Sequence, residues 1–233
     1  MPVQKLTRRT ILKRAAGTLA AAISGPTIVP SSVFGAEGRV SPNDRVRIGY
    51  IGVGRRSRQL MGLPEGAEIT AYADLYQKRL DEMKARNASA KTFLDYREML
   101  ASDTIDAVVI ATPDHWHTLP VVHACEAKKD VYIEKPMTLT VREGRAIVDA
   151  VKKHNVVLQT GSQQRSGSAC QRACKELLDG CIGKIHTIHG ANYPSPWDCD
   201  LGDEPVPDGL NWDMWCGQTE PRAYHRDVFL PRA

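Results

Sequence analysis

The sequence predicts an α/β fold in which a doubly wound parallel sheet is followed by the start of an incomplete α+β second domain. Short apolar runs alternate with helical patterns between residues 46 and 159, which is the order of a sheet with crossover helices. One run, residues 107–111, is apolar throughout, as expected of a parallel strand buried on both faces. The alternation stops near residue 165, where we place a domain boundary.

The individual elements follow from hydrophobic periodicity and from the Gly, Pro and Asp residues that end each run. Strands are expected at residues 46–51, 68–73, 91–93, 107–111, 131–133 and 156–159. Helices are expected between them at residues 55–63, 77–86, 96–102, 117–128 and 141–154. Beyond the boundary, the pattern predicts a helix at residues 170–178 and a strand at residues 184–193.

The composition is that of an ordinary globular protein. Of the 233 residues, 42% are hydrophobic and 25% are charged, which provides for a sizeable core. Aromatic residues make up only 6%, which disfavours a protein that stacks nucleic-acid bases. The net charge of +4 comes from residues 1–36, because subtracting their five basic residues from 31 leaves 26 against 27 acidic residues. The charge therefore gives no argument for a nucleic-acid partner.

The first 36 residues are similar to a twin-arginine export signal. Arg8 and Arg9 are adjacent, a hydrophobic pair and a lysine follow them, and residues 15–23 are weakly apolar and rich in Ala. That stretch is too short to span a hydrocarbon core of about 30 Å as a permanent helix. The pattern predicts a periplasmic protein without stable membrane insertion. The alternative is an N-terminal amphipathic helix with two chance arginines.

The six cysteines lack the spacing of a metal site. They stand at positions 125, 170, 174, 181, 199 and 216, and no two of them are separated by only two residues. We therefore expect no zinc site and mostly buried free thiols. Disulfides are the alternative, because export would place the protein in an oxidising compartment.

A glycine-rich turn after the first strand points to a dinucleotide. The turn reads Gly-Val-Gly-Arg-Arg-Ser, in which Gly52 permits a tight turn and Gly54 lets the backbone approach a pyrophosphate. Asp74 lies 20 residues past Gly54, at the end of the second strand, where a carboxylate can hold both ribose hydroxyls. The combination predicts NAD, with NADP as the alternative because Arg79 lies close in sequence. Taken singly, the glycines are typical of a plain turn and Asp74 of a helix N-cap.

Two further strand ends carry polar residues at the edge where doubly wound sheets bind ligands. Residues 112–117 read Thr-Pro-Asp-His-Trp-His, and the alternative for His115 and His117 is a surface or capping role. A metal pair is not favoured, since no third ligand follows at suitable spacing. The fifth strand ends in Glu-Lys-Pro, where Pro136 keeps Lys135 extended. A lysine there can steady a ribose or donate to a substrate oxygen, whereas the alternative is a surface turn.

Several motifs occur together, in order, at residues 47–54, 112–117, 134–136, 159–165 and 212–215. Jointly they resemble the glucose–fructose oxidoreductase/inositol dehydrogenase/MocA (Gfo/Idh/MocA) family of oxidoreductases, in its exported bacterial branch. The resemblance covers about residues 45–224.

The resemblance implies an organisation and a set of site residues. With the leader included, the chain divides into a signal peptide, a linker, an NAD-binding Rossmann domain and a partial substrate and oligomerisation domain, at residues 1–36, 37–44, 45–165 and 166–233. The resemblance makes Lys135 the catalytic lysine, and the spacing of the candidate ligands gives no reason to expect a metal. Cofactor contacts are expected from Gly52, Gly54, Arg55, Asp74, Thr112, Pro113, His117, Glu134, Lys135, Gln163 and Arg165.

The activity implied by the resemblance is hydride transfer between a sugar or polyol and NAD(P), by a protein that forms a homo-oligomer. Family members usually continue further and supply an Asp and a His on a helix of the second domain, which this chain lacks. We therefore expect a truncated chain that binds cofactor and turns over little. The alternatives are a naturally minimal dehydrogenase and a binding protein of similar fold. Two other functions stay open, namely an NAD-dependent glycosidase on the same scaffold and a nucleotide-binding remnant without turnover.

Overall fold

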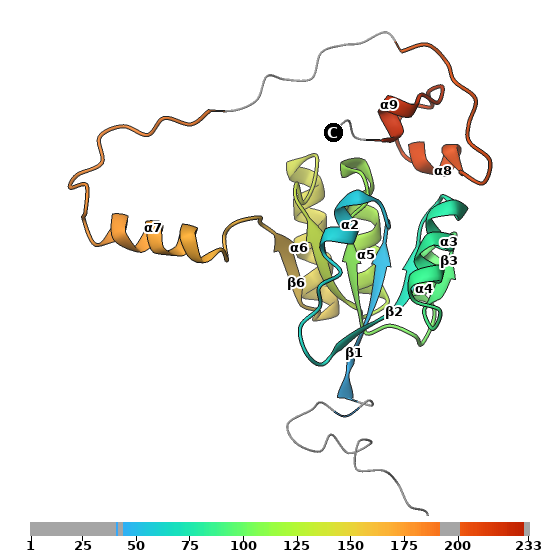
Figure 1. Ribbon diagram of the computed structural model, residues 1–233, viewed down its shortest axis with the longest axis horizontal. Helices are drawn as coiled ribbons and strands as arrows, with labels where there is room; N and C mark the ends of the chain where they lie inside the picture. The colour runs from blue at the N-terminus through green and yellow to red at the C-terminus, as the bar shows by residue number, and fades with distance from the viewer. Residues whose placement is uncertain (1–40, 42–43, 192–200, 231–233) are drawn as a thin grey trace, which may run out of the picture. The chain divides into compact units, whose positions relative to one another are not determined.

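A computed structural model describes residues 41, 44–191 and 201–230 of the chain. Residues 1–45 and residues 46–233 form two units. The second unit contains a six-stranded parallel sheet with the strand order β3-β2-β1-β4-β5-β6 (Figure 1). The first strand, β1, lies at the centre of the sheet. Strands β2 and β3 lie on one side of it, and β4, β5 and β6 lie on the other. The predicted doubly wound fold is therefore confirmed. The predicted signal peptide lies outside the described residues.

The observed elements are close to the expected ones and carry the labels of Figure 1. The strands are β1 (Val46–Ile51), β2 (Ala67–Ala73), β3 (Lys91–Phe93), β4 (Ala107–Ile110), β5 (Asp130–Glu134) and β6 (Leu158–Gly161). The helices between and after them are α2 (Arg55–Gln59), α3 (Gln77–Arg86), α4 (Tyr96–Leu100), α5 (Thr118–Glu126), α6 (Val141–His154), α7 (Ser168–Leu178), α8 (Trp212–Cys216) and α9 (Arg226–Phe229). A short 3₁₀ helix, Asp114–Trp116, precedes α5.

The sheet has a hydrophobic core on each face. On one face, Tyr50, Tyr72 and Val109 pack with Leu80 and Met83 of α3. On the other face, buried residues of α4, α5 and α6 pack against strand residues that include Ile51, Ala73, Val108, Ile110 and Ile133. Because side chains of neighbouring strand residues point to opposite faces, the central strands must be apolar at nearly every position. This explains the continuous apolar run that predicted β4.

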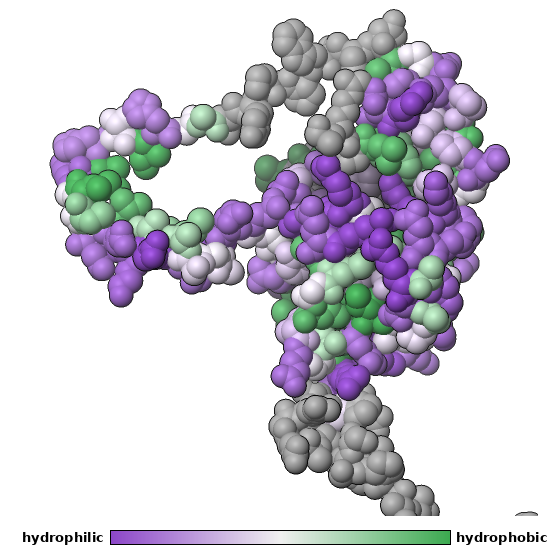
Figure 2. Space-filling view, in the orientation of Figure 1, coloured by the Kyte–Doolittle hydropathy of each residue, from purple (hydrophilic) through white to green (hydrophobic). Residues whose placement is uncertain are grey.

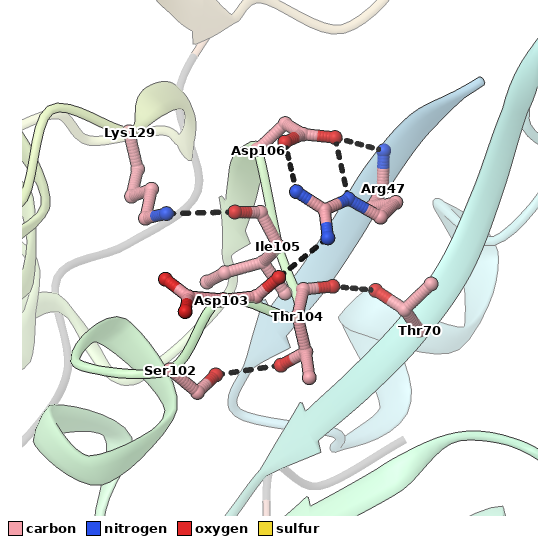
Figure 3. Close-up of polar contacts among 8 residues, drawn as sticks. All are labelled: Arg47, Thr70, Ser102, Asp103, Thr104, Ile105, Asp106 and Lys129. Carbon is pink, nitrogen blue, oxygen red and sulfur yellow. Dashed lines mark hydrogen bonds and ion pairs between the residues drawn. The ribbon is translucent and has the colours of Figure 1, made fainter. Parts of the chain in front are cut away.

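Polar links close the amino edge of the sheet, the edge opposite the carboxyl ends of the strands (Figure 3). Two atoms of the Arg47 guanidinium donate to the Asp106 carboxylate, Nη2 to Oδ1 at 2.6 Å and Nε to Oδ2 at 3.0 Å. Thr70 donates to the Thr104 carbonyl at 2.7 Å, and Lys129 donates to the carbonyl of the next residue. The hydrogen bonds from Arg47 hold the pKa of Asp106 below its usual value. The loop before β4 is thereby fastened to β1 and β2, which leaves the other edge for the site.

Capping explains why the boundaries of α6 match the prediction. The Thr140 side chain accepts from the Glu143 amide at 3.2 Å, and the Glu143 carboxylate accepts from the Thr140 amide at 2.8 Å. This reciprocal pair is a capping box, which satisfies backbone donors at the helix start. Asn155 ends the helix in the left-handed conformation, with φ +54°.

Three predicted elements differ most from the observed ones. The helix expected at residues 55–63 ends at Gln59, and the strand expected at residues 156–159 is observed at Leu158–Gly161. The strand expected at residues 184–193 is wrong for residues 184–191, which form no strand, and its last two residues lie outside the described ones. A strand needs a neighbour to pair with, and residues 184–191 pair with no strand in the described part of the chain.

Helix α7 has no buried residue. Leu178 is 88% exposed and Ile188, further along, is 84% exposed, and Figure 2 shows apolar green among the purple of this segment. The expectation of buried thiols is wrong for the three cysteines in and after α7, because nothing in the described part of the chain packs over them. Cys125 and Cys216 are buried, whereas the free thiols of Cys170, Cys174 and Cys181 are exposed, and Cys199 lies outside the described residues. No described helix is long and apolar enough to cross a membrane.

Candidate functional site

A groove of about 750 Å³ opens at the carboxyl edge of the sheet. Its walls come from the segments that follow β1, β2, β4 and β5, and from residues 214–229 of the C-terminal segment. Because the strands are parallel, all of their carboxyl ends reach this one edge, where doubly wound sheets bind ligands. The size of the groove lies within the range of small-molecule and cofactor sites, about 300–1,000 Å³.

Gly52 occupies a position that only glycine fits. Its φ is +81°, and an added Cβ atom would lie 3.0 Å from the carbonyl oxygen of Ala111 at the end of β4. Gly54 is the extended N-cap residue of α2. Ser57, at the place of the usual third glycine, is fully buried, and its hydroxyl has no hydrogen-bond partner among the described residues. The predicted turn is therefore tight where the glycine fingerprint requires it, and α2 accommodates a serine against the sheet.

Asp74 is buried at the end of β2 and accepts two backbone hydrogen bonds. Its Oδ2 atom accepts from the Val53 amide at 2.8 Å, and its Oδ1 atom accepts from the Tyr76 amide at 3.0 Å. Burial raises the pKa of Asp74, and the nearby Arg79 and the two amides oppose that effect without cancelling it. The N-cap of α3 is Tyr76, so the N-cap alternative for Asp74 is wrong. The carboxylate instead joins the glycine turn to the start of α3 while lining the groove.

His117 links the ends of two strands. It is 1% exposed, its Nε2 atom lies 3.1 Å from the Thr112 carbonyl oxygen, and its Nδ1 atom contacts the carbonyl oxygen of Pro136. The surface alternative for His117 is therefore wrong, and its side chain makes no helix-capping bond. The ring fixes the segment after β4 relative to the loop that follows β5, and it also lines the groove.

Glu134 forms a buried ion pair with Arg56, a residue that the sequence prediction did not include. Arg56 Nη2 lies 2.7 Å from Glu134 Oε1, and the carboxylate side chain is only 4% exposed. Glu134 Oε2 also accepts from the amide of Lys135 at 3.2 Å. A Cβ atom on Gly161 would lie 3.0 Å from Oε1, so the end of β6 leaves room for this pair. Lys135, whose peptide bond to Pro136 is cis, is exposed and lines the groove.

The C-terminal segment reaches the groove through the loop between β2 and α3. Leu210 forms an isolated antiparallel bridge with Tyr76. The amide of Gln77 donates to the Gly209 carbonyl at 2.9 Å, and the amide of Asn211 donates to the Leu75 carbonyl at 3.0 Å. These backbone bonds bring a segment that is more than 130 residues away in sequence beside the residues that follow Asp74.

A second anchor joins this segment to the residues after β4. The Trp215 carbonyl oxygen accepts from Trp116 Nε1 at 2.9 Å and lies 2.8 Å from His115 Nε2. Gly217 has a φ of +56°, and a Cβ atom there would overlap the Trp116 indole. The segment is held together by an aromatic cluster of Trp212, Trp215, Tyr224 and Phe229, with Trp212 and Trp215 stacked at 4.4 Å. His115 therefore has a packing role in this anchor.

The structure brings all but one of the predicted site residues to the groove. Those that line it are Gly52, Gly54, Arg55, Asp74, Thr112, Pro113, His117, Glu134, Lys135 and Gln163. Arg165 is exposed and does not line it. Their cofactor contacts, and the catalytic role of Lys135, stay predictions. Among the described residues, no group of three or more His, Cys, Asp or Glu side chains is placed to hold a metal ion.

Sequence reasoning missed one whole wall of the groove. Met214, Trp215, Val228 and Phe229 line it from the C-terminal segment, and Arg56 lines it from α2. The Trp-rich stretch was visible in the sequence, but nothing in its local pattern indicated where it packs. The Arg56–Glu134 pair joins residues 78 positions apart, and no motif spacing indicates such a contact.

Comparisons with known proteins agree with this geometry. Residues 46–162 match the family model described as an oxidoreductase family with an NAD-binding Rossmann fold. The chain is 30% identical over 146 residues to the myo-inositol 2-dehydrogenase of Thermotoga maritima, covering 61% of this chain and 44% of that protein. It is 34% identical over 213 residues to a glycosyl hydrolase family 109 protein of Shewanella, covering 78% of this chain and 46% of that protein.

A solved structure gives the same picture. The scyllo-inositol dehydrogenase of Lactobacillus casei, with bound NAD(H) and scyllo-inositol, matches with a TM-score of 0.57 and 26% identity. The match covers 60% of this chain and 43% of that one. The chain thus spans less than half the length of these relatives.

Proposed function

The chain belongs to the Gfo/Idh/MocA oxidoreductase family, which has an NAD-binding Rossmann fold, and from this we propose that it is an NAD(P)-dependent oxidoreductase of a sugar or polyol. One observation carries the proposal: the glycine turn, the acid after β2 and the lysine after β5 all open onto one groove. The inositol dehydrogenases among the relatives support the substrate class.

The residues around the groove fit a dinucleotide. Gly52 has a positive φ and lies close to the end of β4, and a side chain at this position would be strained and would clash there. The extended backbone at Gly54 leaves the turn without a side chain where a pyrophosphate would approach. The Asp74 carboxylate lies beside this turn and would accept hydrogen bonds from ribose hydroxyls. We assign the cofactor contacts of the chain to these residues, together with Thr112 and His117, which line the same groove.

The proposed chemistry places Lys135 against the reacting carbon–oxygen bond. A bound nicotinamide supplies the hydride acceptor or donor. The Lys135 ammonium would donate a hydrogen bond to the substrate oxygen and stabilise the charge that builds there. Glu134 accepts from the Lys135 amide and is itself held by Arg56, so this pair orients the backbone that carries the lysine.

A second candidate is an NAD-dependent glycosidase on the same scaffold. The observation that favours it is the length of the match to the Shewanella glycosyl hydrolase family 109 protein, which covers 78% of this chain against 61% for the inositol dehydrogenase. The two candidates share the cofactor groove and differ in the net reaction. An oxidoreductase accumulates NADH with a polyol, whereas a glycosidase that uses NAD only transiently releases a sugar without net reduction.

We further propose that residues 1–36 direct the protein to the periplasm through the twin-arginine pathway, and that residues 37–44 are a linker. The adjacent arginines and the basic, acid-free leader support this proposal. We also assign residues 45–165 to dinucleotide binding. We assign residues 166–233 to part of a domain that binds substrate and joins subunits, and we propose that the protein forms a homo-oligomer through it. The change in sequence pattern near residue 165 supports that division.

Calorimetric titration of the whole chain with NAD tests the cofactor site. We expect Asp74→Ala to weaken NAD binding by about 10- to 100-fold, because a charged acceptor for the ribose is lost. Asp81→Ala is the matched control, since it removes an exposed acid from the same region, on α3, and should change the affinity by less than about twofold. NAD affinity should also decrease as acid protonates Asp74, whose pKa burial raises, and Asp74→Ala should lack that decrease.

An affinity for NAD that is the same in Asp74→Ala and in the wild-type chain would contradict this assignment. Incubation of the chain with NAD and a panel of sugars, polyols and aryl glycosides then separates the candidates. NADH formation that is lost in Lys135→Met supports the oxidoreductase. Release of aglycone without NADH formation supports the glycosidase.

A further inference from the structure

Helix α7 has an apolar side that no described residue covers. This apolar stripe consists of Cys170, Ala173, Cys174, Leu177 and Leu178. Residues three, four, seven and eight positions apart lie on one side of a helix. Every residue of α7 is exposed, and Leu178 is 88% exposed. A helix of 11 residues is marginally stable in water by itself, because isolated helices need about 12–15 residues. A neighbour over the stripe would therefore stabilise α7.

Glycines mark both ends of this helix. Gly167 is the extended N-cap residue, and Gly180 has a φ of +85°. The amide of Gly180 donates to the Leu177 carbonyl at 3.1 Å. The amide of Cys181 donates to the Glu176 carbonyl, also at 3.1 Å. These two bonds form a Schellman motif, which ends a helix by turning the chain away. The stripe is therefore about three turns long and matches one short helix as its neighbour.

The two halves of the stripe differ in side-chain size. The N-terminal half carries the small side chains of Cys170, Ala173 and Cys174. The C-terminal half carries the large side chains of Leu177 and Leu178. Apolar faces pack well when large side chains of one meet small side chains of the other. A second α7 in the antiparallel direction meets this condition along the whole stripe, whereas a parallel one would place large against large.

The charges of α7 are divided along its length in the same way. Arg172 and Lys175 precede Glu176 and Asp179 in the sequence. An antiparallel copy brings the positive half of each helix beside the negative half of the other, whereas a parallel copy brings like charges together. These charges lie off the stripe, so their attraction acts over a longer distance and weakens with added salt.

We propose, resting on the homo-oligomer proposed above, that the apolar stripe of α7 is a contact between two copies of the chain, in which the two α7 helices pack antiparallel about a two-fold axis. A two-fold contact uses the same face of both copies, so that face must complement itself. The size pattern and the charge pattern of α7 both do so when one helix is reversed. The leucines of each copy then pack beside the cysteines and the alanine of the other.

Sedimentation velocity of the whole chain over a range of protein concentrations tests for this dimer. The wild-type chain should convert from monomer to dimer as its concentration rises. Replacing both leucines, Leu177→Gln with Leu178→Gln, should weaken the dimer at least about tenfold, because the largest apolar side chains of the stripe are lost. Glutamine has nearly the helix propensity of leucine. Leu139→Gln is the matched control, since it replaces a leucine that is 57% exposed outside α7, and it should change the dimer affinity by less than about twofold.

Charge variants test the antiparallel direction. Arg172→Glu with Lys175→Glu makes every charge on α7 negative and should weaken the dimer about two- to fivefold at low salt. Adding Glu176→Lys and Asp179→Lys reverses the divided pattern as a whole and should return the affinity to within about twofold of the wild-type value. An affinity that is equal in the wild-type chain and in the all-negative variant would contradict the antiparallel contact.

Thiol labelling locates the contact independently. Alkylation of Cys174 by iodoacetamide, followed by mass spectrometry, should slow as the dimer forms, because the stripe of the second copy covers this thiol. A rate that does not depend on dimer formation would overturn the proposal. A dimer of unchanged affinity in the double leucine variant would also overturn it, and the homo-oligomer would then stand with a different contact. If the wild-type chain stays monomeric at every concentration, both the homo-oligomer and this contact are wrong.

Discussion

Single charged residues at the groove are held by partners from other elements. Glu134 illustrates this, because a carboxylate that is nearly inaccessible to water needs a positive partner to offset the cost of its burial. Arg56 of α2 supplies that partner at 2.7 Å. A second arginine of the same helix, Arg58, pairs with Glu82 at 2.5 Å, but there both side chains are about a third exposed or more. The two ion pairs have similar lengths and differ mainly in burial, so they allow a direct comparison.

We expect Arg56→Gln to lower the free energy of unfolding by about 2 kcal/mol, because it leaves the buried Glu134 charge without its partner. This value is below the range for fully buried pairs because the arginine itself is 32% exposed. Arg58→Gln is the matched control and should cost less than about 1 kcal/mol, since water screens its pair. Urea unfolding of the three proteins measures both values. Equal decreases of the free energy of unfolding in the two variants would show that the burial of Glu134 does not strengthen its ion pair.

At the scale of elements, one of the two anchors of the C-terminal segment contains a glycine that packs against the residues after β4. Gly217 has a positive φ and lies against the indole of Trp116, which in turn donates to the Trp215 carbonyl. The same segment supplies Met214 and Phe229 to the groove. A short helix such as α8 is not stable by itself, so the segment keeps its place through these contacts and through its aromatic cluster.

We expect Gly217→Ala to loosen the contact of this segment with Trp116, because the methyl group would overlap the Trp116 ring and the backbone conformation is unfavourable for alanine. Tryptophan fluorescence should shift to longer wavelength, and limited proteolysis should cut within residues 201–230 sooner than in the wild-type chain. Gly202→Ala is the control, since no atom lies within 4 Å of a Cβ there. An unchanged emission spectrum and an unchanged proteolysis rate in Gly217→Ala would exclude this anchoring role.

At the scale of the whole molecule, the chain combines an NAD-binding Rossmann fold with a strongly basic stretch at residues 1–36. The family model covers residues 46–162, and the five basic residues of that stretch lie before this region. Apart from residues 1–36, the chain is nearly neutral, with a net charge of −1 from 26 basic and 27 acidic residues. This separation is expected when the basic residues serve an export signal and not the fold.

We expect replacement of Arg8 and Arg9 by lysine to keep the protein in the cytoplasm of an expressing bacterium, because a twin-arginine receptor reads the arginine pair and not its charge. Cell fractionation followed by immunoblotting measures the distribution. The control is Lys13→Arg, which changes the chemistry of a basic residue outside the pair and should leave export unchanged. Delivery of the double variant outside the inner membrane at the wild-type level would rule out the twin-arginine assignment.

Local patterns in the sequence were sufficient for the sheet and for the edge that carries the groove. Strand residues alternate between two buried faces, and the caps at Thr140 and Asn155 set helix ends within a few residues, so both features depend on neighbours in the sequence. The glycine turn and Asp74 were likewise predictable, because a conformation available only to glycine and an acid at a strand end follow from short-range geometry.

Only the tertiary structure decided which distant residues complete the groove. The Arg56–Glu134 pair, the burial of His117 and the wall around Trp215 and Phe229 each depend on residues that packing brings together from separate elements. The absence of the predicted strand at residues 184–191 has the same cause, because the apolar pattern specifies a face but supplies no partner for the backbone groups. The hydrophobic periodicity of a segment indicates which of its side chains are buried. The residues that cover those side chains come from distant parts of the sequence and are known only from the folded structure.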